Sequence, residues 1–291
     1  ADKKGYDIRL EAAAAKEWTT VKAWHLLDDT MQIRGGRGYE TAHSLASRGE
    51  AGVPVERWLR DARINLIFEG SSEIMHLFMA REAVDKHLQV AGSMIDPKVP
   101  WKKKLSALPK IAMFYFVWYL GLWFRGLVMP RFSRFGKLAP HLRFVERRSR
   151  KLAREIFHSM VVFRAAAERK QAFLFRLVDI ANELFAMAAS ISRAQTLART
   201  GRGEAEHAAA LAENFCAQAR ERVDQLFYAL WHNHDDLAYR TGRAILAGEH
   251  AWLERGVPGL GLTIDDLRPK LPPAPPAESP RPGLASRSMS A

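Results

Sequence analysis

The sequence of 291 residues predicts an all-α protein. Apolar residues recur at close to a 3.6-residue period in several long segments, as they do on the buried face of a helix. The period-2 alternation that is typical of half-buried strands is absent throughout, so we expect no substantial sheet. The second half is rich in Ala, Leu, Arg and Glu, which are strong helix formers. A Pro- and Ser-rich stretch closes the sequence.

The first predicted helix covers residues 8–34. Its periodic apolar positions are Leu10, Ala14, Val21, Trp24, Leu27 and Met31. Gly35 and Gly36 then end the helix, because glycine takes the left-handed conformation that closes a helix without strain. From there we expect a loop rich in Gly, Ser and Ala that runs to Pro54.

A second helical stretch, VPVERWLRDARINLIFEG, starts at Val53 and leads to two serines. The hydroxyls of Ser71 and Ser72 could cap the next helix. That helix carries an apolar face and fades at Gly92 and Pro97. Long helical patterns then cover residues 141–199 and 204–231, and a turn at residues 201–203 joins them.

Cys216 is the single cysteine of the sequence, which excludes an internal disulfide and suits a reducing compartment. The tail, residues 268–291, is predicted to be disordered because it has almost no large apolar residues. We expect no secretory signal, since the first residues are charged and lack an apolar stretch.

Positive charge is concentrated in one segment of the chain. The formal net charge is +12, yet Lys98–Arg154 alone contains 15 Lys and Arg residues and one acid, Glu146. The high basicity therefore belongs to this segment. Base-stacking aromatics do not interleave its cluster Arg147, Arg148, Arg150 and Lys151. We do not expect nucleic-acid binding.

The segment Ile111–Met129 inside this basic region is apolar and strongly aromatic. Arg125 interrupts it, and basic residues flank both sides, so a membrane span is disfavoured. Aromatic residues with cationic flanks are typical of a helix that lies in the interface of an anionic membrane. A helix docked on protein and a true span remain open alternatives.

An acid stands in an unusual place in the stretch RINLIFEGSSEI, residues 63–74. Glu69 separates an apolar run from a flexible Gly-Ser-Ser step. Burial would raise the pKa of such a carboxyl group and make it a stronger base once deprotonated. The alternative interpretation is a solvated turn residue.

Three motifs carry a resemblance. QIRGGRGYE (residues 32–40), PVERWLRDARI (residues 54–64) and FEGSSEI (residues 68–74) follow one another as in the C-terminal domain of the acyl-CoA dehydrogenase family. The stretch from Phe175 to Arg199 resembles the extra C-terminal helical domain of the very-long-chain branch. The insert Thr41–Val53 departs from the family pattern, which has only a few residues there.

The resemblance implies that the chain is the C-terminal portion of a longer protein. We expect a partial helical bundle at residues 1–95, with the base and FAD motifs, and a basic, aromatic, membrane-associating segment at residues 96–140. A helical extension domain should follow at residues 141–267, before the disordered tail at 268–291.

The resemblance also implies roles for individual residues. Glu69 matches the catalytic base, and Phe68 and Gly70 match its substrate-contacting neighbours. The FAD-contacting positions are Gln32, Ile33, Arg34, Gly35 and Gly36, which act across a subunit boundary, together with Ser71, Ser72 and Glu73. Plain helix capping by the two serines is compatible with this role.

The implied function is FAD-dependent α,β-dehydrogenation of long-chain acyl-CoA to trans-2-enoyl-CoA by the parent enzyme. The implied partners are the acyl-CoA substrate, electron-transfer flavoprotein or a similar acceptor, a second identical subunit, and an anionic membrane surface. The location would be cytoplasmic, peripheral on the inner face of a membrane, or on the matrix side in mitochondria. The chain alone should be inactive, because the family's N-terminal helical domain and middle β-domain have no counterpart in it.

Two other interpretations of the sequence differ from this function. One is a non-catalytic, membrane-associated helical interaction module derived from the same fold. The other is a di-iron site, since Glu-x-x-His occurs at Glu40, Glu73 and Glu155. Such a site needs two further inward glutamates, and Glu40 lies in the glycine-rich loop. We expect no metal.

Overall fold

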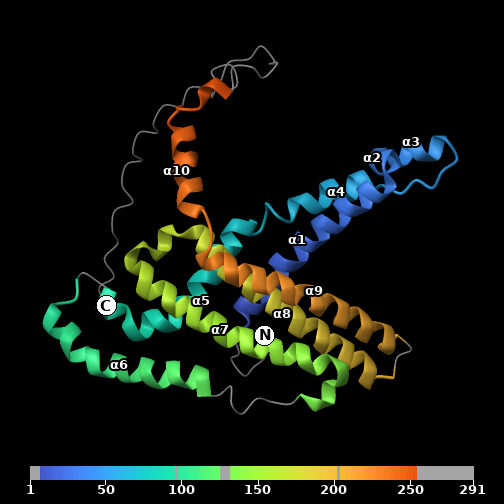
Figure 1. Cartoon of the computed structure of the whole chain (residues 1–291). Coiled ribbons are helices and arrows are strands. Elements are labelled where there is room, and N and C mark those ends of the chain that lie inside the picture. The colour runs from blue at the N-terminus through green and yellow to red at the C-terminus, as the bar shows by residue number, and fades with distance from the viewer. Residues whose placement is uncertain (1–6, 96–97, 125–131, 202–203, 254–291) are drawn as a thin grey trace, which may run out of the picture. The chain divides into compact units, whose positions relative to one another are not determined.

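The computed structural model describes residues 7–95, 98–124, 132–201 and 204–253. Within these ranges every regular element is a helix, which confirms the predicted fold class (Figure 1). The chain divides into two compact units, Ala1–Asn233 and His234–Ala291. All candidate site residues belong to the larger unit.

Two helices lie side by side as an arm of the larger unit, α1 (Arg9–Arg34) and α4 (Val55–Ile64) (Figure 1). The guanidinium group of Arg63 stacks over the ring of Trp24 at 5.3 Å, a cation–π contact that ties the two helices together. As predicted, α1 ends at Gly35, whose φ is +57°.

The loop predicted between Gly35 and Pro54 is wrong in part, because it contains two short helices. They are α2 (Gly36–Tyr39) and α3 (Ala42–Ser47), at the outer end of the arm (Figure 1). The hydroxyl of Thr41 caps α3 by accepting the Ser44 N–H at 3.2 Å, and Leu45 is fully buried. The glycine-rich composition of this stretch favoured a loop, so the sequence did not predict the cap by Thr41 or the burial of Leu45.

The helix α5 (Ser72–Ile95) packs against α1 and against a later helix, α8 (Gln171–Arg199). Its small contact cluster consists of Ala13, Ala14, Met79, Ala80 and Val178. Three of these five side chains are single methyl groups. Small residues let helix axes approach closely, so the N-terminal helices lie directly on α8.

The helix α6 (Trp101–Phe124) begins ten residues before the predicted aromatic segment and contains Pro109. One face docks on protein: the ring of Tyr115 lies 4.8 Å from that of Phe157, and Trp118 lies 5.0 Å from His87. The opposite face leaves five apolar side chains 57–63% exposed, those of Met113, Phe116, Val117, Trp123 and Phe124. Residues 125–129 of the predicted segment lie outside the described residues.

The predicted helical pattern over residues 141–199 is wrong as a continuous helix. The structure has α7 (Ala139–Phe163), a 3₁₀ turn η2 (Arg164–Arg169) and then α8. The break occurs at Arg164, whose φ is +49°. Because α8 must fold back to pack on α7, tertiary contacts override the good helix propensity of the sequence RAAAER.

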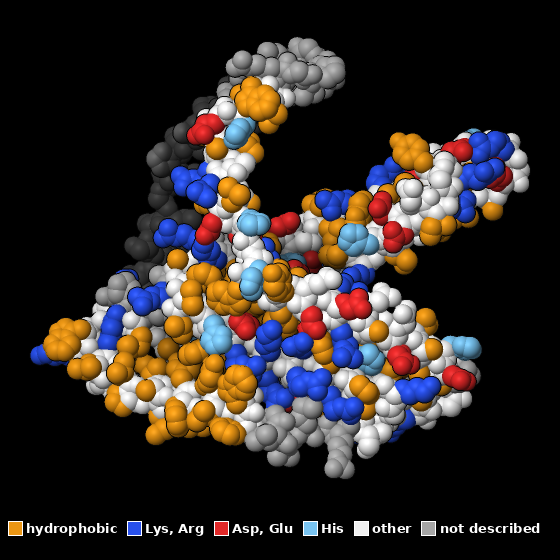
Figure 2. Space-filling view, viewed as in Figure 1, with side chains coloured by type: hydrophobic (Ala, Val, Ile, Leu, Met, Phe, Trp, Pro, Cys, Tyr) orange, Lys and Arg blue, Asp and Glu red, His pale blue; other side chains and the backbone are white. Residues whose placement is uncertain are grey.

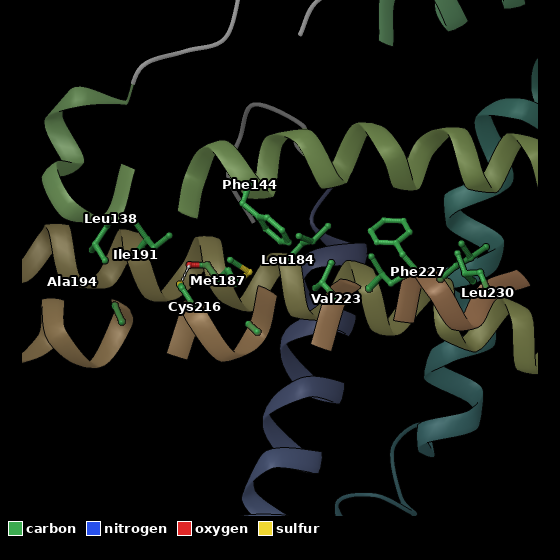
Figure 3. Close-up of a cluster of buried hydrophobic side chains, with 14 of the residues drawn as sticks. Leu138, Phe144, Leu184, Met187, Ile191, Ala194, Cys216, Val223, Phe227 and Leu230 are labelled. Atoms are coloured by element: carbon green, nitrogen blue, oxygen red, sulfur yellow. Dashed lines mark hydrogen bonds between the residues drawn. The ribbon is translucent and has the colours of Figure 1, made fainter. Parts of the chain in front are cut away.

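The main core lies where α7, α8 and α9 (Ala205–Trp231) meet, next to the 3₁₀ turn η1 (Ser133–Leu138). Figure 3 shows side chains of α8 and α9 pointing toward one another, with Phe144 of α7 reaching toward them. Cys216 is fully buried there as a free thiol, and burial raises its pKa to about 11. A buried thiol with a raised pKa is structural and unreactive.

The smaller unit contains α10 (Asp235–Leu246) and the turn η3 (Ala251–Leu253). Asp235 and Asp236 stand in the first turn of α10, where negative charge complements the helix dipole. The tail predicted to be disordered, residues 268–291, lies outside the described residues.

Candidate active site

The turn between α4 and α5 holds the predicted catalytic motif. The chain forms a tight turn after Ile64. The carbonyl of Ile64 accepts the N–H groups of both Ile67 and Phe68, at 3.0 and 2.9 Å. Two consecutive residues then take positive φ, Glu69 at +53° and Gly70 at +94°. These left-handed residues reverse the chain so that α5 can start.

Glycine is required at position 70. A Cβ atom added there would lie 2.6 Å from the sulfur of Met75, and the φ angle is unfavourable for other residues. Glu69 has no such freedom, and a left-handed conformation costs a non-glycine residue about 1–2 kcal/mol. Strain of this kind concentrates at functional sites, which makes Glu69 a candidate on structural grounds as well.

The side chain of Glu69 is exposed in this chain. Its neighbours Ile67 and Phe68 are also exposed, by 51% and 63%. The expectation of an acid buried among apolar residues is therefore wrong for the chain taken alone, because no described residue covers this turn. The exposed apolar side chains around the acid are a surface that other protein or ligand atoms could cover.

The backbone of the turn is held by a residue that sequence analysis missed. The ammonium group of Lys16, on α1, donates hydrogen bonds to the carbonyls of Asn65 at 2.9 Å and Gly70 at 2.5 Å. These carbonyls lie on either side of Glu69, so Lys16 clamps both ends of the turn. Its signal in the sequence was a single lysine after four alanines in EAAAAKEW.

One backbone donor at the turn stays available. In the part of the chain that the structure describes, no carbonyl accepts the N–H of Glu69. A backbone N–H beside a carboxylate offers a hydrogen-bond donor and a base to the same ligand. The geometry therefore suits a substrate with an acidic C–H next to a carbonyl group.

The three residues after Gly70 open helix α5. The Ser71 hydroxyl accepts the Ile74 N–H at 3.5 Å, which is a weak capping contact. A backbone hydrogen bond within Glu73, followed by one from the Ser71 hydroxyl, holds the pKa of the Glu73 carboxyl below its usual range. The capping interpretation of Ser71 thus has support in the structure, and the cofactor role of Ser71, Ser72 and Glu73 stays a prediction.

The other predicted cofactor residues, Gln32 to Gly36, lie at the far end of α1. The rise of a helix places Arg34 about 27 Å along the axis from Lys16, so the two motifs do not meet within one chain. Ile33 is 85% exposed, and nothing lies within 4 Å of the position of a Cβ atom on Gly35 or Gly36. A ligand or a second subunit has open access to this backbone.

A buried polar network joins the N-terminal helices to α8 and α9, and sequence analysis missed it. His76 contacts Asp179 at 2.8 Å and the carbonyl of Ser72 at 2.7 Å, and Glu17 lies 3.7 Å from its ring. Glu183, on α8, accepts bonds from Trp18 at 3.3 Å and Arg222 at 2.9 Å.

The three Glu-x-x-His pairs do not converge. His76 is used in the polar network, while His158 bonds Tyr119 at 3.1 Å and Glu40 pairs with Arg48. Within the described ranges no group of three His, Cys, Asp or Glu residues is arranged to hold a metal ion.

Comparison with known proteins finds two family models in this chain. The model "Acyl-CoA dehydrogenase, C-terminal domain" matches residues 1–84, and "ACAD9/ACADV, C-terminal domain" matches residues 137–247. These are the families that the sequence motifs resemble.

Curated relatives cover most of the chain. A probable acyl-CoA dehydrogenase, FadE10, of Mycobacterium tuberculosis is 51% identical over 258 residues, which is 88% of this chain and 40% of the relative. The human mitochondrial very long-chain specific acyl-CoA dehydrogenase is 31% identical over 270 residues, 88% of this chain and 37% of the relative. The chain thus spans about two fifths of the length of these relatives.

One solved structure has a similar fold. The acyl-CoA dehydrogenase from Bacillus anthracis, crystallised with FAD, superposes with a TM-score of 0.52 at 20% sequence identity. The match covers 80% of this chain and 35% of that protein. At this identity the likeness concerns the fold alone.

Proposed function

Because this chain carries the C-terminal domains of the acyl-CoA dehydrogenase family, we propose that it supplies the catalytic base for α,β-dehydrogenation of a fatty acyl-CoA. The observation that carries the proposal is the strained, clamped turn at Glu69, which presents a carboxylate and a free N–H together. A non-catalytic module has no support among the relatives reported above, which are all named as dehydrogenases.

The proposed role of Glu69 is to take a proton from the carbon α to the thioester. The N–H of Glu69 would donate to the thioester carbonyl oxygen, where negative charge develops as the proton leaves. The electron pair of the broken C–H bond then forms the double bond to the β-carbon while hydride leaves that carbon. The product is a trans-2-enoyl-CoA.

In this proposal the rest of the parent protein completes the pocket, which is consistent with the exposed state of Glu69 in this chain. Phe68 and Gly70 border the carboxylate and would contact the acyl chain. A dry environment strengthens every electrostatic interaction of the turn, so covering Glu69 is part of its activation.

The residues present fit FAD as cofactor. Gly35 and Gly36 leave open space beside their backbone, and Ser71 stands at the start of a 24-residue helix, where phosphate oxygens bind readily. FAD, when bound, supplies the acceptor for the hydride. Because the two motifs lie at opposite ends of α1, a second copy of the chain would contribute Gln32–Gly36, which makes a homodimer part of the proposal.

We also propose a peripheral membrane location, cytoplasmic or on the matrix side in mitochondria. Among the described helices, α6 is long and apolar enough to cross a membrane, and its outer face is exposed. Its inner face is docked on α5 and α7, so the helix fits the interface of an anionic membrane better than a span. Electron-transfer flavoprotein or a similar acceptor would take the electrons from the flavin.

The assignment of Glu69 is tested with Glu69→Gln in the intact parent protein. The amide keeps the size of the side chain and cannot act as a base, so flavin reduction by acyl-CoA should slow by ~10²–10⁴ or more. Flavin content and acyl-CoA binding should stay near those of the unchanged protein. Substitution of the exposed Glu11 by Gln is the matched control. Near-normal flavin reduction in Glu69→Gln would refute the assignment.

A further inference from the structure

A strongly basic pocket lies between α6, α7 and α9, away from the turn at Glu69. Its volume is about 380 Å³. Six cationic side chains line it: Arg147, Arg148, Arg150, Lys151, Arg154 and Arg220. The one acid in its lining is Asp224. Leu122 and Trp123 of α6 form its apolar edge.

Only part of this charge is balanced within the protein. Arg148 pairs with Asp224, and Arg150 pairs with Glu146 at 2.9 Å. Over the described ranges, Lys151, Arg154 and Arg220 form no ion pair. The lining of the pocket therefore carries more positive than negative charge.

Aromatic rings hold these cations in fixed positions. Arg148 and Arg220 lie over the ring of Phe144, at 5.0 and 4.9 Å. Lys151 lies 4.3 Å from the ring of Phe227. A guanidinium group that stacks on a ring keeps its N–H edge free to bind an oxyanion, so these contacts prepare the pocket for a ligand.

The cations also destabilise one another. Burial is the first cause, and repulsion by Arg148 the second, that lowers the pKa of Lys151. The carboxylates of Glu155 and Asp224 oppose this shift, and Arg154 adds to the repulsion. A bound anion would relieve it, which is the electrostatic condition of an anion site.

We propose that this pocket binds a phosphate group. Phosphate suits it because a planar guanidinium edge pairs with two phosphate oxygens at once, and several arginines converge on one small space. Figure 2 shows the basic side chains gathered beside the orange surface of α6. Since the pocket opens next to this apolar face, the phosphodiester of an anionic lipid headgroup is one source, and a soluble phosphate is the other.

A lipid headgroup as the source of the phosphate rests on the peripheral membrane location proposed above. A soluble phosphate as the source does not depend on that location. Nonspecific binding of an anion would depend only on the net charge of the protein. Binding in this pocket would depend on which cationic side chains are removed. The two can therefore be separated with variants that lose equal charge.

The test uses the intact protein with Lys151→Gln/Arg220→Gln, and Lys102→Gln/Lys103→Gln as the charge-matched control on the exposed start of α6. Calorimetry with inorganic pyrophosphate measures the soluble source. Sedimentation with phosphatidylglycerol vesicles, against phosphatidylcholine vesicles, measures the lipid source. The pocket variant should weaken binding of at least one of them by about tenfold or more, as expected for lost charged hydrogen bonds, and the control should not.

Binding of vesicles only would identify a lipid headgroup, and binding of pyrophosphate as well would identify a general phosphate site. Equal losses in the two variants, or no binding of either probe, would overturn the proposal. Arg154→Gln serves as a second pocket variant if the double variant has a lowered melting temperature. Acyl-CoA-dependent flavin reduction should be unchanged in all of them, which keeps this test separate from that of Glu69.

Discussion

At the scale of single residues, the turn at Glu69 depends on a contact made far away in sequence. Lys16 reaches the carbonyls of Asn65 and Gly70 from another helix and so fixes the left-handed backbone of Glu69 between them. The resemblance to a family points to Glu69 as the proposed base, but it does not show what orients this residue. A shift of about 1 Å in a reacting group can cost 10²-fold in rate.

Lys16→Met in the intact protein should therefore slow flavin reduction by roughly tenfold to a hundredfold per bound flavin. The Michaelis constant for acyl-CoA should change little, because Lys16 holds the base rather than the substrate. Lys16→Arg should recover part of the rate by donating to the same carbonyls. Lys22→Met, on the same helix but beside Glu183, is the control. A rate for Lys16→Met equal to that of the control would show that the clamp has no role in the reaction.

At the scale of elements, the composition of α6 left three interpretations open, and the structure shows that one face of the helix is docked and the other is exposed. Tyr115 and Trp118 dock on α5 and α7, while Phe116 and Val117 point outward. A helical period of 3.6 places adjacent residues about 100° apart, so neighbours in sequence serve different surfaces. Aromatic content alone could not separate the docked rings from the exposed ones.

The exposed face should carry the part of membrane binding that salt does not remove. Phe116→Ser/Val117→Ser should reduce binding to phosphatidylglycerol vesicles at high salt by about tenfold or more, since burying one large apolar side chain stabilises by ~1.5–3 kcal/mol. Leu211→Ser, at another exposed apolar residue, should leave binding unchanged. Trp118→Ser should instead lower the melting temperature, because Trp118 packs on His87. Unchanged sedimentation of the Phe116→Ser/Val117→Ser variant would refute the interfacial role.

At the scale of the whole larger unit, a buried polar network connects the two regions matched by different family models. Groups from three helices face the ring of His76: Glu17 on α1, the Ser72 carbonyl on α5, and Asp179 with Phe175 on α8. Burial opposes protonation of this ring. The bonds to Asp179 and Ser72 and the charges of Asp179 and Glu17 together outweigh burial and raise the pKa of His76.

This network should make stability depend on pH. Because the pKa of His76 is raised by folding, its contribution is complete below the unfolded value of about 6.5 and is lost as pH rises through the folded value. His76→Gln should therefore reduce the free energy of unfolding more at pH 6 than at pH 8.5, as measured by urea denaturation. Burial lowers the pKa values of His87 and His141, so these residues change the free energy of unfolding with pH in the opposite direction. Comparison with the unchanged protein at each pH cancels their contribution. An equal loss at both pH values would contradict a charged His76.

The sequence by itself determined the helical class, the ends of α1 and α5, and the motif around Glu69 to which we propose a catalytic role. These features depend on local patterns: the 3.6-residue period, glycines with positive φ, and residues adjacent in the chain. The sequence did not predict the features that depend on contacts between residues far apart in the chain. The break at Arg164, the short helix around buried Leu45 and the clamp by Lys16 all follow from packing between segments that the sequence separates. Tertiary structure alone decided these features, because the free energy of such contacts exceeds the small local preferences on which sequence patterns rest.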